Sequence, residues 1–259
     1  MTHIFDLTGK VAAVVGGASG IGEAVTIGAV RLGARVVCCD LNERAASSVA
    51  TRGSRDGSCE AAALDIRDAG AVDRRFDEIR ARHGSLDIVI CTPSINVRKK
   101  ILEYRPEDFD RVVDLNLKGN FNVLRSAGRI MTSARRGSIV LFSSIRSQVV
   151  EPGQSVYAAT KAGIVQMART AACEFGPYGV RVNAIGPGVI ETPLTAPIKS
   201  NPDWFQAYAA KSVFSRWGKP EEMVGPTLFL ASDAASYVTG TILFADGGWL
   251  AADGRFTPP

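Results

Sequence analysis

A glycine-rich turn follows directly on the first apolar run of the chain and leaves few folds open to it. The run covers Val11 to Val15, and residues 16–22 read Gly-Gly-Ala-Ser-Gly-Ile-Gly. Glycines at this spacing serve a tight turn, close approach of the backbone to a pyrophosphate, and packing of a helix on a strand. A helix that starts here aims its N-terminus at the phosphates. The turn therefore predicts a dinucleotide site that includes Gly16, Ser19, Gly20, Ile21 and Gly22.

Apolar, β-branched runs of strand length recur along the chain, and helix-length segments follow most of them. Parallel strands need such long crossovers, so the alternation predicts an α/β fold of the doubly wound Rossmann type, with helices on both faces of a parallel sheet. The chain has 259 residues, of which 46% are hydrophobic, so one domain over residues 1–259 has ample core material. The expected strands cover residues 11–15, 35–39, 60–64, 86–91, 138–142, 180–185 and 242–245.

The segment between Gly186 and Pro220 departs from this alternation. It is rich in proline and then carries Trp204, Phe205 and Tyr208 on an expected short helix. We interpret residues 189–217 as a small lid inserted into the domain.

Composition argues against several other classes of protein. No run approaches the ~20 apolar residues of a membrane-spanning helix, and residues 1–6 lack the order of a signal peptide, so we expect a cytoplasmic protein with no membrane partner. The net charge of +4 is spread along the chain, which argues against a nucleic-acid partner. Five cysteines without paired spacing predict small buried thiols and no metal site. The adjacent Cys38 and Cys39 should face opposite sides of the sheet.

Two acidic residues follow strands on the expected dinucleotide side. Asp40, at the end of the second strand, can accept hydrogen bonds from ribose hydroxyls and repels a 2′-phosphate, while Ser19 offers no cation to bind one. We therefore predict NAD in preference to NADP. The alternative for Asp40 is a solvated cap for the helix near Asn42. Asp65, with Ile66 beside it, either contacts the adenine or caps the helix near Ala69.

A tyrosine and a lysine spaced i, i+4 form a candidate acid/base pair. Tyr157 and Lys161 leave one face of a helix together, and a nearby ammonium lowers the pKa of a phenol toward the neutral range. Ser144 closes the fifth strand at the carboxyl edge of the sheet, where its hydroxyl can bind the reacting oxygen. Each also has a structural interpretation: Ser144 as a helix cap, Tyr157 as a core aromatic and Lys161 as a surface lysine.

These features together resemble the short-chain dehydrogenase/reductase family, and the likeness runs from Leu7-Thr8-Gly9-Lys10 to Asp246-Gly247-Gly248. The resemblance implies a seven-stranded sheet and a hydride transfer between a nicotinamide cofactor and an alcohol or carbonyl carbon. It also implies a catalytic set of Asn116, Ser144, Tyr157 and Lys161, in which Tyr157 exchanges the proton and Ser144 positions the substrate oxygen. Lys161 would bind the nicotinamide ribose and tune Tyr157, and Asn116 would hold a water in a proton relay.

The resemblance carries further expectations. The Pro187-Gly188 segment would lie at the nicotinamide, with Ile190 and Thr192 against its carboxamide, and the long helices around 106–131 and 155–175 would join subunits into a homotetramer. Two positions depart from the family pattern. Val15 replaces the usual Thr before the turn, and Cys91-Thr92-Pro93-Ser94 replaces Asn-Asn-Ala-Gly after the fourth strand. We interpret the two changes as one altered contact, because the family's Thr helps to tie down that same loop.

Substrate choice is expected to rest on four polar residues near the catalytic set: Asn96, Arg98, Arg146 and Gln154. Two guanidiniums near a reacting carbon suit a small carboxylate substrate such as a sugar acid or a hydroxy acid. Alternatively, Arg98 lies in a solvated loop and Arg146 pairs with a structural acid such as Glu151.

Other substrates and one other class of protein stay open at this point. Residues 192–197, 216–218 and 223–226 resemble the gluconate 5-dehydrogenase-like sugar-acid dehydrogenases of the family. An uncharged cyclic or aromatic alcohol or a 3-oxoacyl group is the alternative substrate, because lid aromatics can line an apolar pocket: Trp204, Phe205, Tyr208 and Phe214. An NAD-binding regulatory protein would normally carry a broken acid/base set, and here the set is complete.

Overall fold

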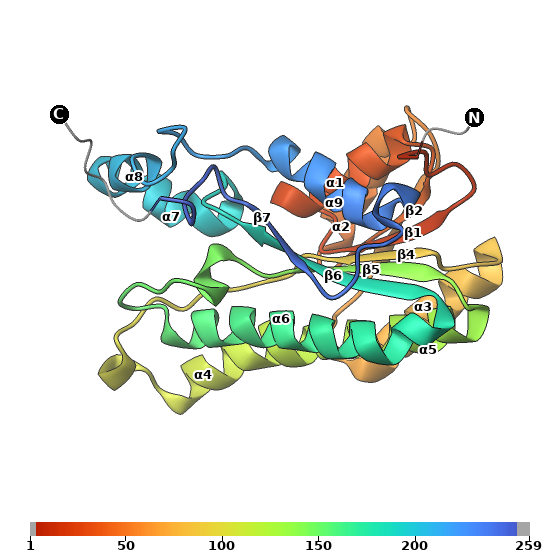
Figure 1. Cartoon of the computed structure of the whole chain (residues 1–259), viewed down its shortest axis with the longest axis horizontal. Helices are drawn as coiled ribbons and strands as arrows, with labels where there is room; N and C mark the ends of the chain where they lie inside the picture. The colour runs from red at the N-terminus through yellow and green to blue at the C-terminus, as the bar shows by residue number, and fades with distance from the viewer. Residues whose placement is uncertain (1–3, 253–259) are drawn as a thin grey trace.

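A computed structural model describes residues 4–252, and its centre is a seven-stranded parallel sheet (Figure 1). The strand order is β3-β2-β1-β4-β5-β6-β7. The seven expected strands are confirmed, with ends that differ by at most two residues. Strands β1, β4 and β5 are buried along almost their whole length, which explains their continuous apolar sequences. The strands are β1 Val11–Val15, β2 Arg35–Asp40, β3 Cys59–Ala63, β4 Ile88–Cys91, β5 Gly137–Phe142, β6 Val180–Pro187 and β7 Ile242–Ala245.

Helices cover both faces of the sheet, as the alternation predicts. Helices α1, α2 and α9 lie on one face, and α3, α5 and α6 lie on the other (Figure 1). Each face has its own apolar core, and Cys38 and Cys39 belong to opposite ones, as expected. The helix bounds are α1 Gly20–Arg31, α2 Glu43–Gly53, α3 Ala69–His83, α4 Pro106–Val113, α5 Asn120–Ala134, α6 Ser155–Phe175, α7 Ala196–Lys199, α8 Pro202–Ala209 and α9 Val224–Ala231.

The order in which strands are added to the sheet reverses between β1 and β4: β2 and β3 lie on one side of β1, and β4 to β7 lie on the other. Strand β1 pairs with β2 on one side and with β4 on the other, so the crossovers that leave these strands diverge. In open α/β sheets ligands bind outside the carboxyl ends of the strands at such a switch point. The topology therefore places a ligand crevice next to the glycine-rich turn.

The long helix expected around residues 106–131 is not continuous. A π-helical turn, Asp114–Gly119, separates α4 from α5. Within it the side-chain amide of Asn120 donates to the backbone carbonyl of Asn116 at 2.8 Å. That side chain satisfies a carbonyl in the widened turn, so the break at Asn116 has a local cause.

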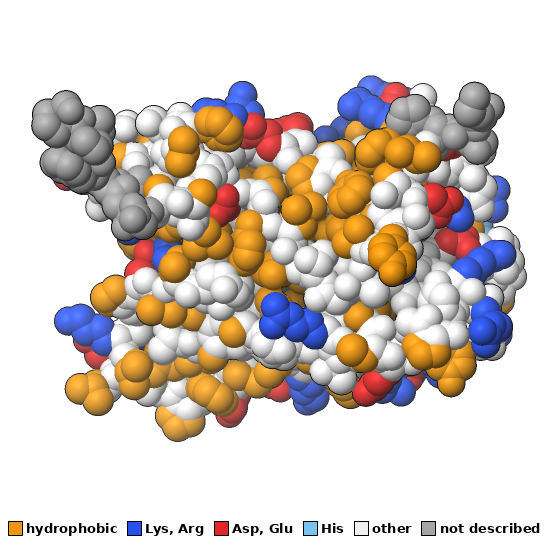
Figure 2. All heavy atoms as spheres, in the orientation of Figure 1, with side chains coloured by type: hydrophobic (Ala, Val, Ile, Leu, Met, Phe, Trp, Pro, Cys, Tyr) orange, Lys and Arg blue, Asp and Glu red, His pale blue; other side chains and the backbone are white. Residues whose placement is uncertain are grey.

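Residues 189–217 form a separate small layer at one end of the sheet. They include α7 and α8, from which Ile198 and Tyr208 pack with Trp217 and Trp249 in one apolar cluster. Phe205 stacks on Trp217 at 4.8 Å between ring centroids, so this aromatic packs within the layer itself. Among residues 4–252 no helix has the length and hydropathy needed to cross a bilayer. On the face in Figure 2, basic and acidic side chains are interspersed without a patch of one sign.

Candidate active site

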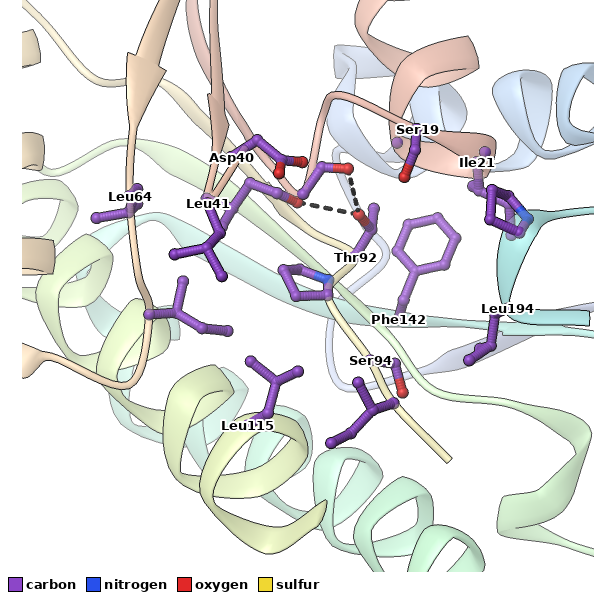
Figure 3. A pocket seen from close by; sticks show the side chains of 18 of the residues that line it. Ser19, Ile21, Asp40, Leu41, Leu64, Thr92, Ser94, Leu115, Phe142 and Leu194 are labelled. Atoms are coloured by element: carbon purple, nitrogen blue, oxygen red, sulfur yellow. Dashed lines mark hydrogen bonds between the residues drawn. The ribbon is translucent and has the colours of Figure 1, made fainter. Parts of the chain in front are cut away.

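A cavity of about 570 Å³ lies at the carboxyl ends of the central strands, where the switch point places it. This dinucleotide cavity is lined by the glycine-rich turn and by Asp40, Asp65 and Ile66. In Figure 3, Ser19 and Asp40 lie along the top of the cavity, Leu64 lies at its left and Leu115 lies below it. The cavity thus gathers nine of the predicted cofactor residues: Gly16, Ser19, Gly20, Ile21, Gly22, Asp40, Asp65, Ile66 and Thr192. Sequence reasoning missed Leu41 and Arg111, which approach from β2 and α4 and carry no motif.

The turn itself fits a dinucleotide. Gly16 and Gly20 have φ of +74° and +52°, conformations that L side chains rarely adopt. A Cβ on Gly22 would lie 2.0 Å from the carbonyl oxygen of Gly16, so the helix can approach the turn only without a side chain. Helix α1 begins at Gly20, and its first backbone amides are free to bind phosphate oxygens.

Asp40 connects the turn to the segment after β2. Its carboxylate accepts hydrogen bonds from the backbone amides of Ala18 at 3.1 Å and Asn42 at 2.9 Å. The side chain of Asn42 caps α2 by accepting from Ala45, so the interpretation of Asp40 as that helix's cap is wrong. A carboxylate has about four acceptor sites, so two remain for a ligand.

Asp65 does not cap the following helix either. Asp68 accepts from the first turn of α3, and Asp65 instead forms an ion pair with Arg67 at 2.7 Å. A hydrogen bond from Arg67 lowers the pKa of the Asp65 carboxyl below its ordinary value. Both residues line the dinucleotide cavity, so they bring a balanced pair of charges to its wall.

Thr92 supplies the hydroxyl that position 15 lacks. Its Oγ1 donates to the carbonyl oxygens of Val15 and Gly16 at 3.0 and 3.1 Å, the dashed contacts in Figure 3. A Cβ on Gly16 would lie 2.9 Å from Pro93 Cδ, so the loop after β4 presses on the turn. The two departures from the family pattern therefore meet in one contact, in which the hydroxyl comes from the loop after β4 instead of from the first strand.

We expect Thr92→Val to weaken NAD binding about fivefold, because the turn loses a hydrogen bond while the side-chain shape is kept. The second change Val15→Thr should restore part of the affinity by returning a hydroxyl to the same interface. Isothermal titration of both variants with NAD measures the effect. Unchanged affinity in Thr92→Val would mean that the hydroxyl does not hold the turn.

A second cavity, of about 290 Å³, contains the predicted catalytic hydroxyls. Ser144 and Tyr157 line it together, from the end of β5 and the first turn of α6. Ser144 also accepts a hydrogen bond from the backbone amide of Arg146 at 3.1 Å, so its capping role coexists with its place in this cavity. Thus Ser144 is held in a fixed orientation beside the phenol.

Lys161 is buried, with 2% of its surface exposed, so the interpretation as a surface lysine is wrong. Its Nζ donates to the carbonyl of Phe142 at 2.8 Å and lies 5.5 Å from the centre of the Tyr157 ring. Burial lowers the pKa of Lys161 to about 8. Burial also raises the pKa of Tyr157, and the hydroxyls of Ser144 and Ser94 offset only part of that rise. The lowered phenol pKa that the pair predicted is thus not seen in the protein alone.

Asn116 lies in the π-helical turn beneath this site. Its side chain forms two hydrogen bonds with the backbone of Ile95, at 2.9 and 2.8 Å, and a third to Thr160 Oγ1 at 3.3 Å. Thr160 precedes Lys161 on α6, so Asn116 connects the loop after β4 to α6. The four predicted catalytic residues lie in the segment after β5, in the π-helical turn and on α6.

The sequence model described as enoyl-(acyl carrier protein) reductase matches residues 16–250. The chain belongs to the short-chain dehydrogenase/reductase family. A 3-oxoacyl-(acyl-carrier-protein) reductase of Thermotoga maritima is 37% identical over 93% of this chain and 98% of its own length. A 2-dehydro-3-deoxy-D-gluconate 5-dehydrogenase of Pseudoalteromonas atlantica is 34% identical over 96% and 99%.

Solved structures agree with this assignment. A gluconate 5-dehydrogenase of Burkholderia cenocepacia, crystallised with NADP and tartrate, superposes with a TM-score of 0.93 at 30% identity, over 96% of this chain and 98% of the other. The protein is therefore an NAD(P)-dependent oxidoreductase that acts on CH–OH groups of a small molecule. The resemblance to sugar-acid dehydrogenases is likewise confirmed.

The wall of the second cavity gathers all four predicted substrate residues: Asn96, Arg98, Arg146 and Gln154. Glu151 pairs with both arginines, each at 2.6 Å, as the alternative interpretation of Arg146 states. Sequence reasoning missed Tyr208 as a partner of Glu151, because the two residues lie 57 positions apart. Trp204 and Tyr208 line this cavity, whereas Phe214 does not line it and is 68% exposed.

The residues expected at the nicotinamide, Pro187, Gly188, Ile190 and Thr192, do not all line one cavity. Thr192 lines the dinucleotide cavity, and Gly188 lines the second one. Ile190 is buried and its side chain packs toward Gly218, outside both. Pro187, at the end of β6, lines neither of them. A contact of these residues with the carboxamide stays a prediction.

Proposed function

We propose that the protein is an NAD-dependent dehydrogenase that interconverts a secondary alcohol and a ketone in a sugar acid or a hydroxy acid. One observation carries the proposal: a single cavity of about 290 Å³ holds the hydroxyls of Ser144 and Tyr157 together with the guanidiniums of Arg98 and Arg146. Guanidinium binds carboxylates with paired hydrogen bonds, so the substrate's acid group would lie at the arginines and its alcohol carbon at Tyr157.

The chain's own residues then divide the chemistry. Tyr157 takes the alcohol proton during oxidation and returns it during reduction, while Ser144 holds the reacting oxygen in place. Asn116 bonds Thr160, whose hydroxyl donates to the backbone carbonyl of Tyr157, and Lys161 is held separately by the carbonyl of Phe142. These contacts position Tyr157 and the ammonium beside it. When bound, the nicotinamide supplies or accepts the hydride. Residues 189–217 would close over the substrate and exclude water.

A substrate panel tests this function. Nicotinamide absorbance is followed with sugar acids, hydroxy acids, polyols, and cyclic or aromatic alcohols. Turnover of acids at kcat/KM at least about tenfold above the matching uncharged alcohols supports the proposal. Turnover confined to uncharged alcohols contradicts the acid assignment.

We expect the rate of alcohol oxidation to rise with pH up to about 8 and then to level off. Oxidation needs unprotonated Tyr157, and because burial raises the pKa of Tyr157, each pH unit gives about tenfold more phenolate. Burial lowers the pKa of Lys161 to about 8. Above that pH the fraction of charged Lys161, which supports the phenolate, falls as steeply as the fraction of phenolate rises. Initial rates between about pH 6 and pH 10 measure this profile. A continued rise would show that Lys161 keeps its proton.

We propose NAD as the preferred cofactor on the strength of Asp40, whose carboxylate lines the cavity at the end of β2. Asp40→Ala removes the charge that repels a 2′-phosphate, and Arg67 and Arg111 line the same cavity. We therefore expect the ratio of kcat/KM for NAD over NADP to fall at least about tenfold in this variant. An unchanged ratio would assign Asp40 to holding the turn alone.

A 3-oxoacyl substrate is the second candidate. The relative from Thermotoga maritima, 37% identical, is named a 3-oxoacyl reductase, and the lid contributes apolar side chains to the cavity. Reduction of an acetoacetyl thioester faster than of a keto acid would favour this candidate over the sugar acid.

We also propose a homotetramer. Helices α4 and α5 leave Phe109 and Phe121 half exposed on one outer layer, as expected of a face that packs against another subunit. Light scattering that gives a monomer mass would contradict this assembly.

A further inference from the structure

Glu151 joins side chains from three parts of the chain behind the substrate cavity. Its Oε1 accepts from Arg98 Nη1 at 2.6 Å and from Gln154 and the Tyr208 hydroxyl, while its Oε2 accepts from Arg146 Nη2 at 2.6 Å. The donors come from the loop after β4, the segment before α6, and α8 of the lid. The Glu151 side chain is 16% exposed, so water competes little for these contacts.

The donors of this cluster face the substrate cavity, and Glu151 lies behind them. All four donors line the 290 Å³ cavity with Ser144 and Tyr157, whereas Glu151 does not line it. Aromatic rings fix both guanidiniums, Arg98 at 4.9 Å from the centre of the Trp204 ring and Arg146 at 5.6 Å from Trp249. Arg146 uses only Nη2 of its guanidinium for hydrogen bonds within residues 4–252, so Nε and Nη1 stay available to a ligand.

The charges of this cluster do not cancel. Burial raises the pKa of Glu151, but hydrogen bonds from Tyr208 and Arg98 and the charge of Arg146 outweigh it, and the net pKa is lowered. Glu151 is therefore ionised at neutral pH and opposes one of the two arginine charges. The cluster faces the cavity with a single net positive charge.

We propose that Glu151 is a specificity-determining residue that sets this cavity to accept one substrate carboxylate and to reject a second one. A monoanion bound at Arg98 and Arg146 makes the whole assembly neutral. A dianion leaves an uncompensated negative charge in a poorly hydrated cavity, which is strongly unfavourable. Without Glu151 the same arginines would match two carboxylates. The inference rests on the proposed function in taking the substrate to be an acid.

Three six-carbon ligands test the inference by binding, separately from turnover. D-glucitol, D-gluconate and D-glucarate carry zero, one and two carboxylates on similar chains. Trp204 and Trp249 lie against the arginines, so tryptophan fluorescence of the enzyme with NAD reports binding. We expect the wild type to bind gluconate at least about tenfold more tightly than glucarate, and Glu151→Gln to reduce that ratio at least about tenfold.

Three variants separate charge from shape. Glu151→Asp keeps the charge and should keep the preference for gluconate. Tyr208→Phe removes a contact to Glu151 without changing charge, so it should weaken both acids alike. Glu221→Gln removes an equal charge from an exposed position that lines no part of this cavity, and the ratio should not change.

Each outcome of these binding measurements either supports or contradicts the inference. An unchanged ratio in folded Glu151→Gln, or equal binding of all three ligands by the wild type, overturns the inference. If Glu151→Gln fails to fold, loss of the preference in Glu151→Asp overturns it and retention supports it. Selective gluconate binding with the expected shift, but without NAD reduction on any acid, supports the cavity assignment and contradicts the proposed function.

Discussion

Replacing Tyr157 with Phe is expected to lower kcat at least about 1,000-fold, while the affinity for NAD stays within about twofold. The phenol oxygen is the group in the substrate cavity positioned to exchange a proton beside Ser144. Phenylalanine keeps the ring that Lys161 Nζ faces at 5.5 Å, so the packing of α6 should be preserved. The loss should appear in kcat, because proton transfer belongs to the chemical step.

Tyr237→Phe is the matched control, since that side chain is fully exposed and lines neither cavity. Steady-state kinetics and isothermal titration of both variants give the comparison. Residual activity above about a tenth of the wild type in Tyr157→Phe would assign the proton transfer to another group. A parallel loss of NAD affinity would instead indicate that the substitution disturbed the cofactor site.

Local sequence signals were sufficient for the fold and for much of the dinucleotide cavity. Strand β1, the glycine-rich turn and α1 follow one another along the chain. The apolar pattern of the strand, the spacing of the glycines and their order in the sequence are therefore enough to predict them. The same holds for Tyr157 and Lys161, whose i, i+4 spacing on α6 fixes their common face. Such features need no information on how distant segments pack.

Contacts between distant segments set the rest of the site. Thr92 meets the turn 76 positions away, and Tyr208 meets Glu151 across 57. The pKa of Lys161 follows from burial beneath β5, which spacing along one helix does not reveal. The arginines pointed to an anion, but only the packed structure shows that Glu151 opposes one of the two charges.

Replacing Gly22 with Ala is expected to weaken NAD binding at least about 100-fold, because the new Cβ would lie 2.0 Å from the Gly16 carbonyl oxygen. That carbonyl belongs to backbone and cannot rotate away as a side chain would. It also accepts a hydrogen bond from Thr92 Oγ1, which a Gly22 Cβ would approach to 2.8 Å. The turn must therefore open or α1 must shift, and either movement displaces the amides that face the phosphates.

Gly225→Ala supplies the matched control for this substitution. Gly225 lies in α9, and a Cβ there meets nothing within 4 Å apart from its chain neighbours, so the NAD affinity should stay within about twofold of the wild type. Pro226 follows directly, so a small loss of stability is expected in place of the usual gain from Gly→Ala. Isothermal titration measures NAD affinity, and thermal unfolding shows whether Gly22→Ala still folds. Wild-type affinity in folded Gly22→Ala would mean that α1 tolerates a wider approach to the turn. The dinucleotide would then depend less on the close helix–turn contact than on Asp40 and the loop after β4.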